Sequence, residues 1–126
     1  MSEIQFVETN EAAQPLGHYS QAVIHNGVVY VATQLGIVPS KPIVVGSIEE
    51  QTYAALSNVQ AILHAAGSDL TEVLKITIYL SDIQLWEQVN TVYMQFFRDH
   101  KPARGVIPCG TLHKGFQIAI DTIASL

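Results

Sequence analysis

Apolar and polar residues alternate one by one over 73–80, VLKITIYL, a pattern typical of a β-strand with two unlike faces. The two faces are expected to consist of Leu74, Ile76, Ile78 and Leu80, and of Val73, Lys75, Thr77 and Tyr79. The second face is neither fully polar nor fully apolar. It therefore suits a partly hydrated interface between subunits, and we expect a homo-oligomer.

Helical spacing of apolar residues replaces this alternation in two other segments. The first, 47–67, begins with a capping box formed by Ser47 and Glu50 and ends at Gly67. Its buried stripe is expected to consist of Ala55, Val59, Ile62, Leu63 and Ala66. The second helix follows a cap at Ser81 or Asp82 and ends near Asp99, before Pro102. The side chains expected on its buried face are Trp86, Val89, Tyr93 and Phe96.

The remaining strands are bounded by turn signals. Asn26-Gly27 joins two β-rich runs within 19–33, which predicts a hairpin, while the prolines of 38–47 predict a loop. Two further strands are expected at 105–109 and 116–124. The order is therefore β-β-β-α-β-α-β-β, a single α+β domain over 1–126 whose two helices cover one face of the sheet.

Composition adds constraints on partners and on location. Hydrophobic residues make up 48% of the chain and charged residues 13%, which indicates that some apolar surface faces other copies. The net charge of −5 and the scattered placement of the six Lys and Arg residues argue against nucleic-acid binding. Neither a signal peptide nor a membrane span is recognisable, and a single Cys109 fits a reducing cytoplasm.

The sequence contains little that indicates a metal site, a nucleotide cofactor or a catalytic nucleophile. The five histidines show no paired spacing, one cysteine cannot form a closed zinc site, and no glycine-rich phosphate loop is present. We therefore expect no metal and no cofactor. Cys109 and His113 resemble a thiolate with its base, but nothing orients the histidine, and a buried or pocket-lining thiol is the better interpretation of Cys109.

Arg104 is the remaining candidate. A guanidinium at the start of a strand either forms an ion pair with an acid such as Asp121 or Glu87, or binds an acidic ligand. Residue types alone leave both alternatives open, with the ion pair slightly favoured.

Several segments resemble one family in their order and spacing. They are GHYSQA at 17–22, EQT at 50–52, LSNVQAILHAAG at 56–67, VLKITIYL at 73–80, VNTVY at 89–93, PAR at 102–104 and IDTIA at 120–124. Over nearly the whole chain they resemble the RidA/YjgF family of reactive-intermediate deaminases. The resemblance implies a chorismate-mutase-like fold with a six-stranded sheet and two helices. It also implies a barrel-like homotrimer with a ligand cleft between subunits.

The same resemblance implies hydrolysis of small 2-imino or enamino acids to 2-oxo acids and ammonia, without a cofactor. Arg104 falls where the family's arginine grips the substrate carboxylate, and Tyr19 and Asn90 also match site positions. Thr33, Gln34 and Cys109 are further expected to contact the substrate.

Three departures alter the expected site. Ala119 stands where the family has the glutamate thought to handle the attacking water, and Asp121 is the candidate replacement. His18 brings a titratable ring to the cleft, and Ala32-Thr33 replaces a serine-glycine pair before Gln34. Hence the alternative to a deaminase is a non-catalytic trimer that binds small 2-oxo or related carboxylic acids. A ribonuclease or translation inhibitor is disfavoured by the acidic composition.

Overall fold

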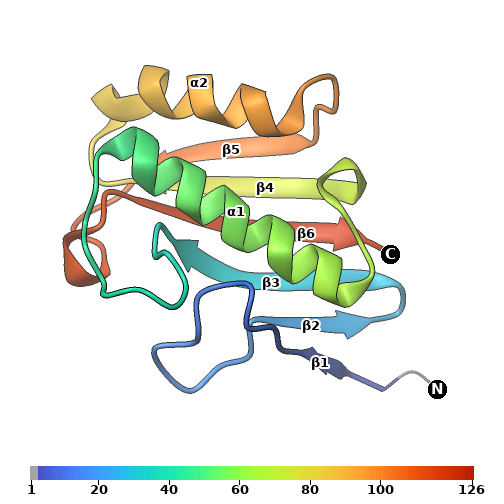
Figure 1. Cartoon of the computed structure of the whole chain (residues 1–126). Coiled ribbons are helices and arrows are strands. Elements are labelled where there is room, and N and C mark those ends of the chain that lie inside the picture. Colours follow the sequence, from blue (N-terminus) through green and yellow to red (C-terminus); the bar gives the residue numbers. More distant parts are fainter. Residues whose placement is uncertain (1–2) are drawn as a thin grey trace.

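The computed structural model describes residues 3–126, which form one six-stranded sheet with two helices (Figure 1). The strands are β1 (Gln5–Val7), β2 (Ala22–His25), β3 (Val28–Leu35), β4 (Val73–Leu80), β5 (Ala103–Pro108) and β6 (Ile118–Ser125). The helices are α1 (Ile48–Ala66) and α2 (Trp86–Phe97). The predicted α+β class and element order are confirmed.

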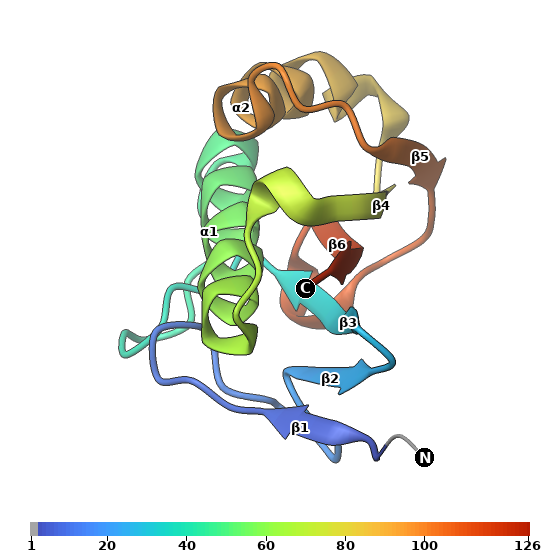
Figure 2. The ribbon, with the colours of Figure 1, turned by 90° about the vertical axis from the view of Figure 1, so that its right-hand side faces the viewer.

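The sheet has the order β1-β2-β3-β6-β4-β5, in which β6 is inserted between β3 and β4. The pairing of β4 with β5 is parallel and the other pairings are antiparallel, so the sheet is mixed. Both helices pack on the same side of the sheet, as Figure 2 shows. Since α2 connects β4 to β5, it lies close to the edge strand that carries Arg104.

Local signals account for most element boundaries. Ser47 and Glu50 form the expected capping box, with 3.1 Å between Glu50 N and Ser47 Oγ and 2.9 Å between Ser47 N and Glu50 Oε1. Gly67 ends α1 in the left-handed conformation, at φ 88°. Asn26 and Gly27 both have positive φ, 51° and 77°, as a two-residue hairpin turn requires.

The second helix starts later than its cap suggests. Asp82 Oδ1 accepts a hydrogen bond from Gln84 N at 2.9 Å and caps a single 3₁₀ turn, Ile83–Leu85, after which α2 begins. Phe97 is buried, whereas Phe96, expected on the buried face, is only half-buried. The ring of Phe96 instead packs edge-on against Tyr53 of α1, with 5.3 Å between the ring centroids.

The predicted faces of β4 are wrong at its first two residues. Val73 is 2% exposed and Leu74 is 51% exposed, the reverse of the expectation. The cause is a bulge, because the pairing with β6 passes from Val73–Ala124 to Lys75–Ile123 and leaves Leu74 as the extra residue. From Ile76 onward the prediction is confirmed, and Ile76, Ile78 and Leu80 are fully buried under the helices.

The face of the sheet away from the helices carries a mixture of apolar and polar side chains. Phe6, Tyr30 and Ile107 on this face are 72%, 44% and 44% exposed. Asp121, Thr77 and Tyr79 lie between them. A half-polar open face is what the sequence predicts, and it remains consistent with an interface between copies.

Candidate functional site

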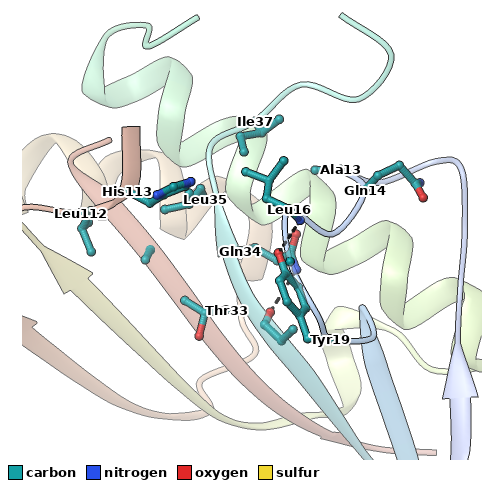
Figure 3. A pocket seen from close by; sticks show the side chains of 13 residues that line it. Ala13, Gln14, Leu16, Tyr19, Thr33, Gln34, Leu35, Ile37, Leu112 and His113 are labelled. Atoms are coloured by element: carbon teal, nitrogen blue, oxygen red, sulfur yellow. Dashed lines mark hydrogen bonds between the residues drawn. The ribbon is translucent and has the colours of Figure 1, made fainter. Parts of the chain in front are cut away.

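A pocket of about 640 Å³ opens beside the end of β3 (Figure 3). Its walls come from the segment before β2, from β3 and β6, and from the 3₁₀ turn His113–Gly115 that precedes β6. Three residues of the predicted site line it: Tyr19, Thr33 and Gln34. Ala119, which the resemblance predicts to replace a glutamate, lines it as well.

The side chains of Tyr19 and Gln34 are fixed by local hydrogen bonds. Tyr19 Oη accepts a hydrogen bond from Leu16 N at 3.2 Å, and the ring remains 48% exposed at the pocket. The amide of Gln34 is buried and donates to Ala32 O at 3.0 Å. Tyr19 therefore offers a ring and a hydroxyl to a ligand, while Gln34 shapes the floor.

Buried amides outside the predicted site hold the walls of the pocket. Asn58 of α1, 1% exposed, accepts from Ala13 N at 3.1 Å and donates to Ile37 O at 2.8 Å. Ala13 and Ile37 both line the pocket and come from different segments of the chain, so the Asn58 side chain connects these two segments. Gln21 donates to Ala13 O at 2.9 Å and thereby adds a second tie. The sequence analysis did not predict these roles of Asn58 and Gln21. The signal that could have indicated the role of Asn58 is a polar residue at a buried position of the helix.

Asp121 does not line the pocket but contacts one residue that does. Its carboxylate accepts hydrogen bonds from the hydroxyl of Thr33 and, at 3.4 Å on the other oxygen, from Tyr79 Oη. The negative charge of Asp121 is the main cause that raises the pKa of Tyr79, with loss of hydration adding to it. Thr33 is therefore the contact between Asp121 and the pocket.

Arg104 is held by α2 and forms no ion pair. Its Nη1 donates to Asn90 Oδ1 at 3.1 Å, and its Cζ lies 4.5 Å from the centroid of the Trp86 ring and 4.8 Å from that of Tyr93. Within residues 3–126 the one ion pair joins His64 to Asp69. The expected alternatives of a pair with Asp121 or Glu87 are thus wrong. Burial raises the pKa of Tyr93, and the positive charge of Arg104 opposes that rise.

Arg104 and Asp121 lie on opposite faces of the sheet. Arg104 pairs with Ile76, which is fully buried on the helix side, whereas Asp121 pairs with Thr77 on the open side. Ala119 pairs with Tyr79 and therefore shares the open face with Asp121. A ligand bound by Arg104 cannot reach Asp121 of the same chain, contrary to the simplest reading of the sequence.

Cations are less scattered than the sequence indicates. Three of the six Lys and Arg residues, Arg98, Lys101 and Arg104, line one pocket of about 450 Å³ with His100 at the end of α2. The expectation of scattered charge is wrong for these three. The net charge of −5 still disfavours a nucleic-acid ligand.

The remaining candidates lie apart from the main pocket. Cys109 is half-buried beyond the end of β5, where its Sγ contacts Gly110 O at 3.4 Å, and no hydrogen bond joins it to His113 within the described chain. His18 lines a neighbouring hollow of about 690 Å³ with Phe6 and Tyr30. Among residues 3–126 no three His, Cys, Asp or Glu side chains are grouped closely enough to hold a metal ion. Nor does that part of the chain contain a helix able to cross a membrane.

Comparison with known proteins places the chain in a family. Residues 9–126 match the model of the family described as Endoribonuclease L-PSP. The chain belongs to this family, the RidA/YjgF family. A RutC family protein of Pyrococcus horikoshii is 40% identical over 125 residues, with 98% of both chains covered.

Two other RidA/YjgF relatives bear on chemistry. The 2-iminobutanoate/2-iminopropanoate deaminase of Bos taurus is 40% identical over 121 residues, covering 95% of this chain and 88% of the relative. The structure of E. coli TdcF with bound serine has a TM-score of 0.92 at 29% identity and covers 97% of this chain and 98% of that one. The family's fold, a six-stranded mixed sheet with two helices, is the fold of this chain.

Proposed function

We propose that the protein hydrolyses small 2-imino or enamino acids to 2-oxo acids and ammonia. The observation that carries this proposal is the state of Arg104, whose guanidinium is oriented by Asn90 and two aromatic rings and is paired with no carboxylate. An oriented guanidinium without a counter-ion is ready to bind the carboxylate of a small acid through two parallel hydrogen bonds. The relative from Bos taurus named as a deaminase supports the reaction class.

The proposed site lies between copies of the chain in a homotrimer. Arg104 and the pocket beside β3 are on opposite faces of one sheet, and Arg104 belongs to the edge strand β5. If Arg104 of one copy faces the Tyr19 pocket of the next copy across a cleft, both can contact the same ligand. The half-polar open face supports such packing.

Positioning is the main requirement of the chemistry. A 2-imino acid is already electrophilic at C2, so fixing its carboxylate on Arg104 aims that carbon into the pocket of the neighbouring copy. Tyr19 and Thr33 then supply hydroxyls, Asn90 is proposed to contact the substrate beside Arg104, and Cys109 is proposed to contact it from the open face of the sheet, the face that carries Ile107 and Tyr79. The reaction consumes water and requires proton transfers, but no change of oxidation state.

Asp121 is proposed to act on the reaction through Thr33. The hydroxyl of Thr33 donates a hydrogen bond to the carboxylate of Asp121. The hydroxyl oxygen of Thr33 can therefore accept a hydrogen bond from a water in the pocket. Asp121 thereby orients a water without itself reaching the substrate. It is a positioning residue in this arrangement.

A second candidate function is binding without catalysis. Ala119 favours it, because a methyl group lines the pocket where the family places a glutamate. TdcF holds a serine in its solved structure, and that ligand is likewise a small carboxylic acid. Both candidates share Arg104 as the carboxylate anchor, and only the rate distinguishes them.

The test generates 2-iminobutanoate with threonine dehydratase and follows the release of 2-oxobutanoate with and without the protein. We expect acceleration over spontaneous hydrolysis, and loss of at least about tenfold in kcat/KM for Arg104→Ala and for Arg104→Lys, since lysine lacks the planar fork. Arg98→Ala, which removes another cation that lines the same small pocket as Arg104, is the matched control. No acceleration, with 2-oxobutanoate still raising the melting temperature in an Arg104-dependent way, selects the binding function.

A further inference from the structure

We propose that His113 is the acid–base residue of the site and does the work of the glutamate that Ala119 replaces. This inference rests on the proposed function. It concerns a side chain for which sequence reasoning found no role beyond a doubtful pairing with Cys109.

The composition of the pocket points to His113. Of the thirteen residues that line it, His113 is the one that carries an imidazole, the side chain that most often acts as a general acid or base in enzymes. His113 and Ala119 line this same pocket, and in Figure 3 the His113 ring lies beside Leu35 at its wall. An acid–base group is thus present in the pocket despite the alanine.

The turn that carries His113 is held by the buried residues that follow it in the chain. Phe116, 1% exposed, packs with Ala13 and Ile37 under the pocket. Gln117 N donates to Gln51 Oε1 at 2.8 Å, which ties the turn to α1. Lys114 and Gly115 have positive φ, 57° and 82°, and reverse the chain between His113 and this anchor. The backbone of His113 is therefore well placed by buried neighbours.

The ring of His113 makes no polar contact with the described residues 3–126. It is exposed, and no hydrogen bond or ion pair engages it among residues 3–126. His100, by contrast, binds Val73 O at 2.8 Å, and His64 binds Asp69 at 3.0 Å. Asp121 is the competing acid–base group, but Thr33 and Tyr79 occupy its oxygens and it does not line the pocket. Both nitrogens of His113 are available to water and to an imine.

The proton transfers can be written with His113 alone. Water attacks C2 of the iminium acid, the C=N π pair moves to nitrogen, and neutral imidazole takes the proton that the water loses. The imidazolium then protonates the amine nitrogen of the carbinolamine. The C–N bond breaks with its electron pair going to nitrogen, and the hydroxyl becomes the carbonyl as its proton passes through imidazole to ammonia. The products are the 2-oxo acid and ammonium, and the imidazole is regenerated.

The test compares His113→Ala with His64→Ala in the 2-iminobutanoate assay; the control removes another exposed histidine, one that does not line the pocket. We expect His113→Ala to lower kcat by about a hundredfold, with the melting-temperature shift by 2-oxobutanoate retained. His64→Ala should leave kcat unchanged. A third variant, His113→Ala with Ala119→Glu, should regain most of the lost rate, because a glutamate then supplies the acid–base group in the same pocket.

The outcomes separate this inference from the function on which it rests. An inactive wild-type protein overturns the proposed function, and the inference with it. An active wild type whose rate is unchanged in His113→Ala overturns the inference alone. Loss of rate together with loss of ligand binding, without rescue by Ala119→Glu, also overturns it, since His113 then only supports the turn.

Discussion

Arg104 illustrates how a charged side chain can be kept in one orientation without a counter-ion. The ring faces of Trp86 and Tyr93 attract the guanidinium electrostatically, and the side-chain oxygen of Asn90 accepts a hydrogen bond from it. Because an amide oxygen carries no net charge, the positive charge of Arg104 is left for a ligand. An ion pair with Asp121 or Glu87 would have neutralised it.

Asp121 gives a prediction at the same scale. If it orients water through Thr33, Asp121→Asn should lower the deaminase rate about tenfold or more, and Thr33→Val should do the same. The double variant should lose little further, because both changes break one interaction. Steady-state rates check this, while the 2-oxobutanoate melting shift should persist.

Tyr79 provides an independent readout of that change. The charge of Asp121 is the main reason that the pKa of Tyr79 is raised, so Asp121→Asn should lower this pKa toward its ordinary value. Ultraviolet titration of the tyrosines, with Tyr79→Phe to identify the signal, measures it. A fall of the pKa without any loss of rate would show that Asp121 has only a structural role.

At the scale of elements, the pocket depends on how closely the end of β3 approaches α1. Gly36 follows β3 and lies against the first turns of α1, where an added Cβ would stand 2.5 Å from the carbonyl oxygen of Gln51. Asn58 then binds Leu35 O and Ile37 O on either side of Gly36. The close contact and the buried amide together set the wall formed by Leu35 and Ile37.

We expect Gly36→Ala to destabilise the protein by about 1 to 3 kcal/mol, because backbone atoms of Gln51 must move to admit the methyl group. Chemical denaturation measures the change. Gly110→Ala is the matched control, since a Cβ at Gly110 meets nothing within 4 Å. Equal stability of the two variants would mean that α1 can shift away from β3 without cost.

Sequence pattern predicts these elements better than it predicts the site. Periodicity and the Ser47, Gly67 and Asn26-Gly27 signals identify both helices and the hairpin, because such interactions are local. The bulge at Leu74 has no local signal and depends on the pairing with β6. The face on which Arg104 points also depends on strand pairing, since β5 joins β4 in parallel after α2. The clustering of Arg98, Lys101 and Arg104 follows from the same crossover.

For the whole molecule, the proposed function depends on assembly, because Arg104 and the Tyr19 pocket are separate within one chain. Each chain offers the guanidinium on one face of its sheet and the Tyr19 pocket on the other. In a closed ring every guanidinium can meet the pocket of the next copy, whereas a monomer has two incomplete halves. Light scattering should accordingly give a mass near three chains, in line with the proposed trimer.

Mixing two inactive variants tests this arrangement directly. Arg104→Ala removes the anchor, and Thr33→Trp fills the pocket without touching Arg104. Each variant alone should be inactive. When the two are unfolded together in equal amounts and refolded, random assembly gives roughly one quarter of the sites an intact Arg104 facing an intact pocket, so roughly one quarter of the wild-type rate should return. Combining both substitutions in one chain and mixing it with wild type controls for refolding, and should also return roughly one quarter of the rate. If the first mixture stays inactive while the control recovers, the guanidinium and the pocket do not act in a shared site.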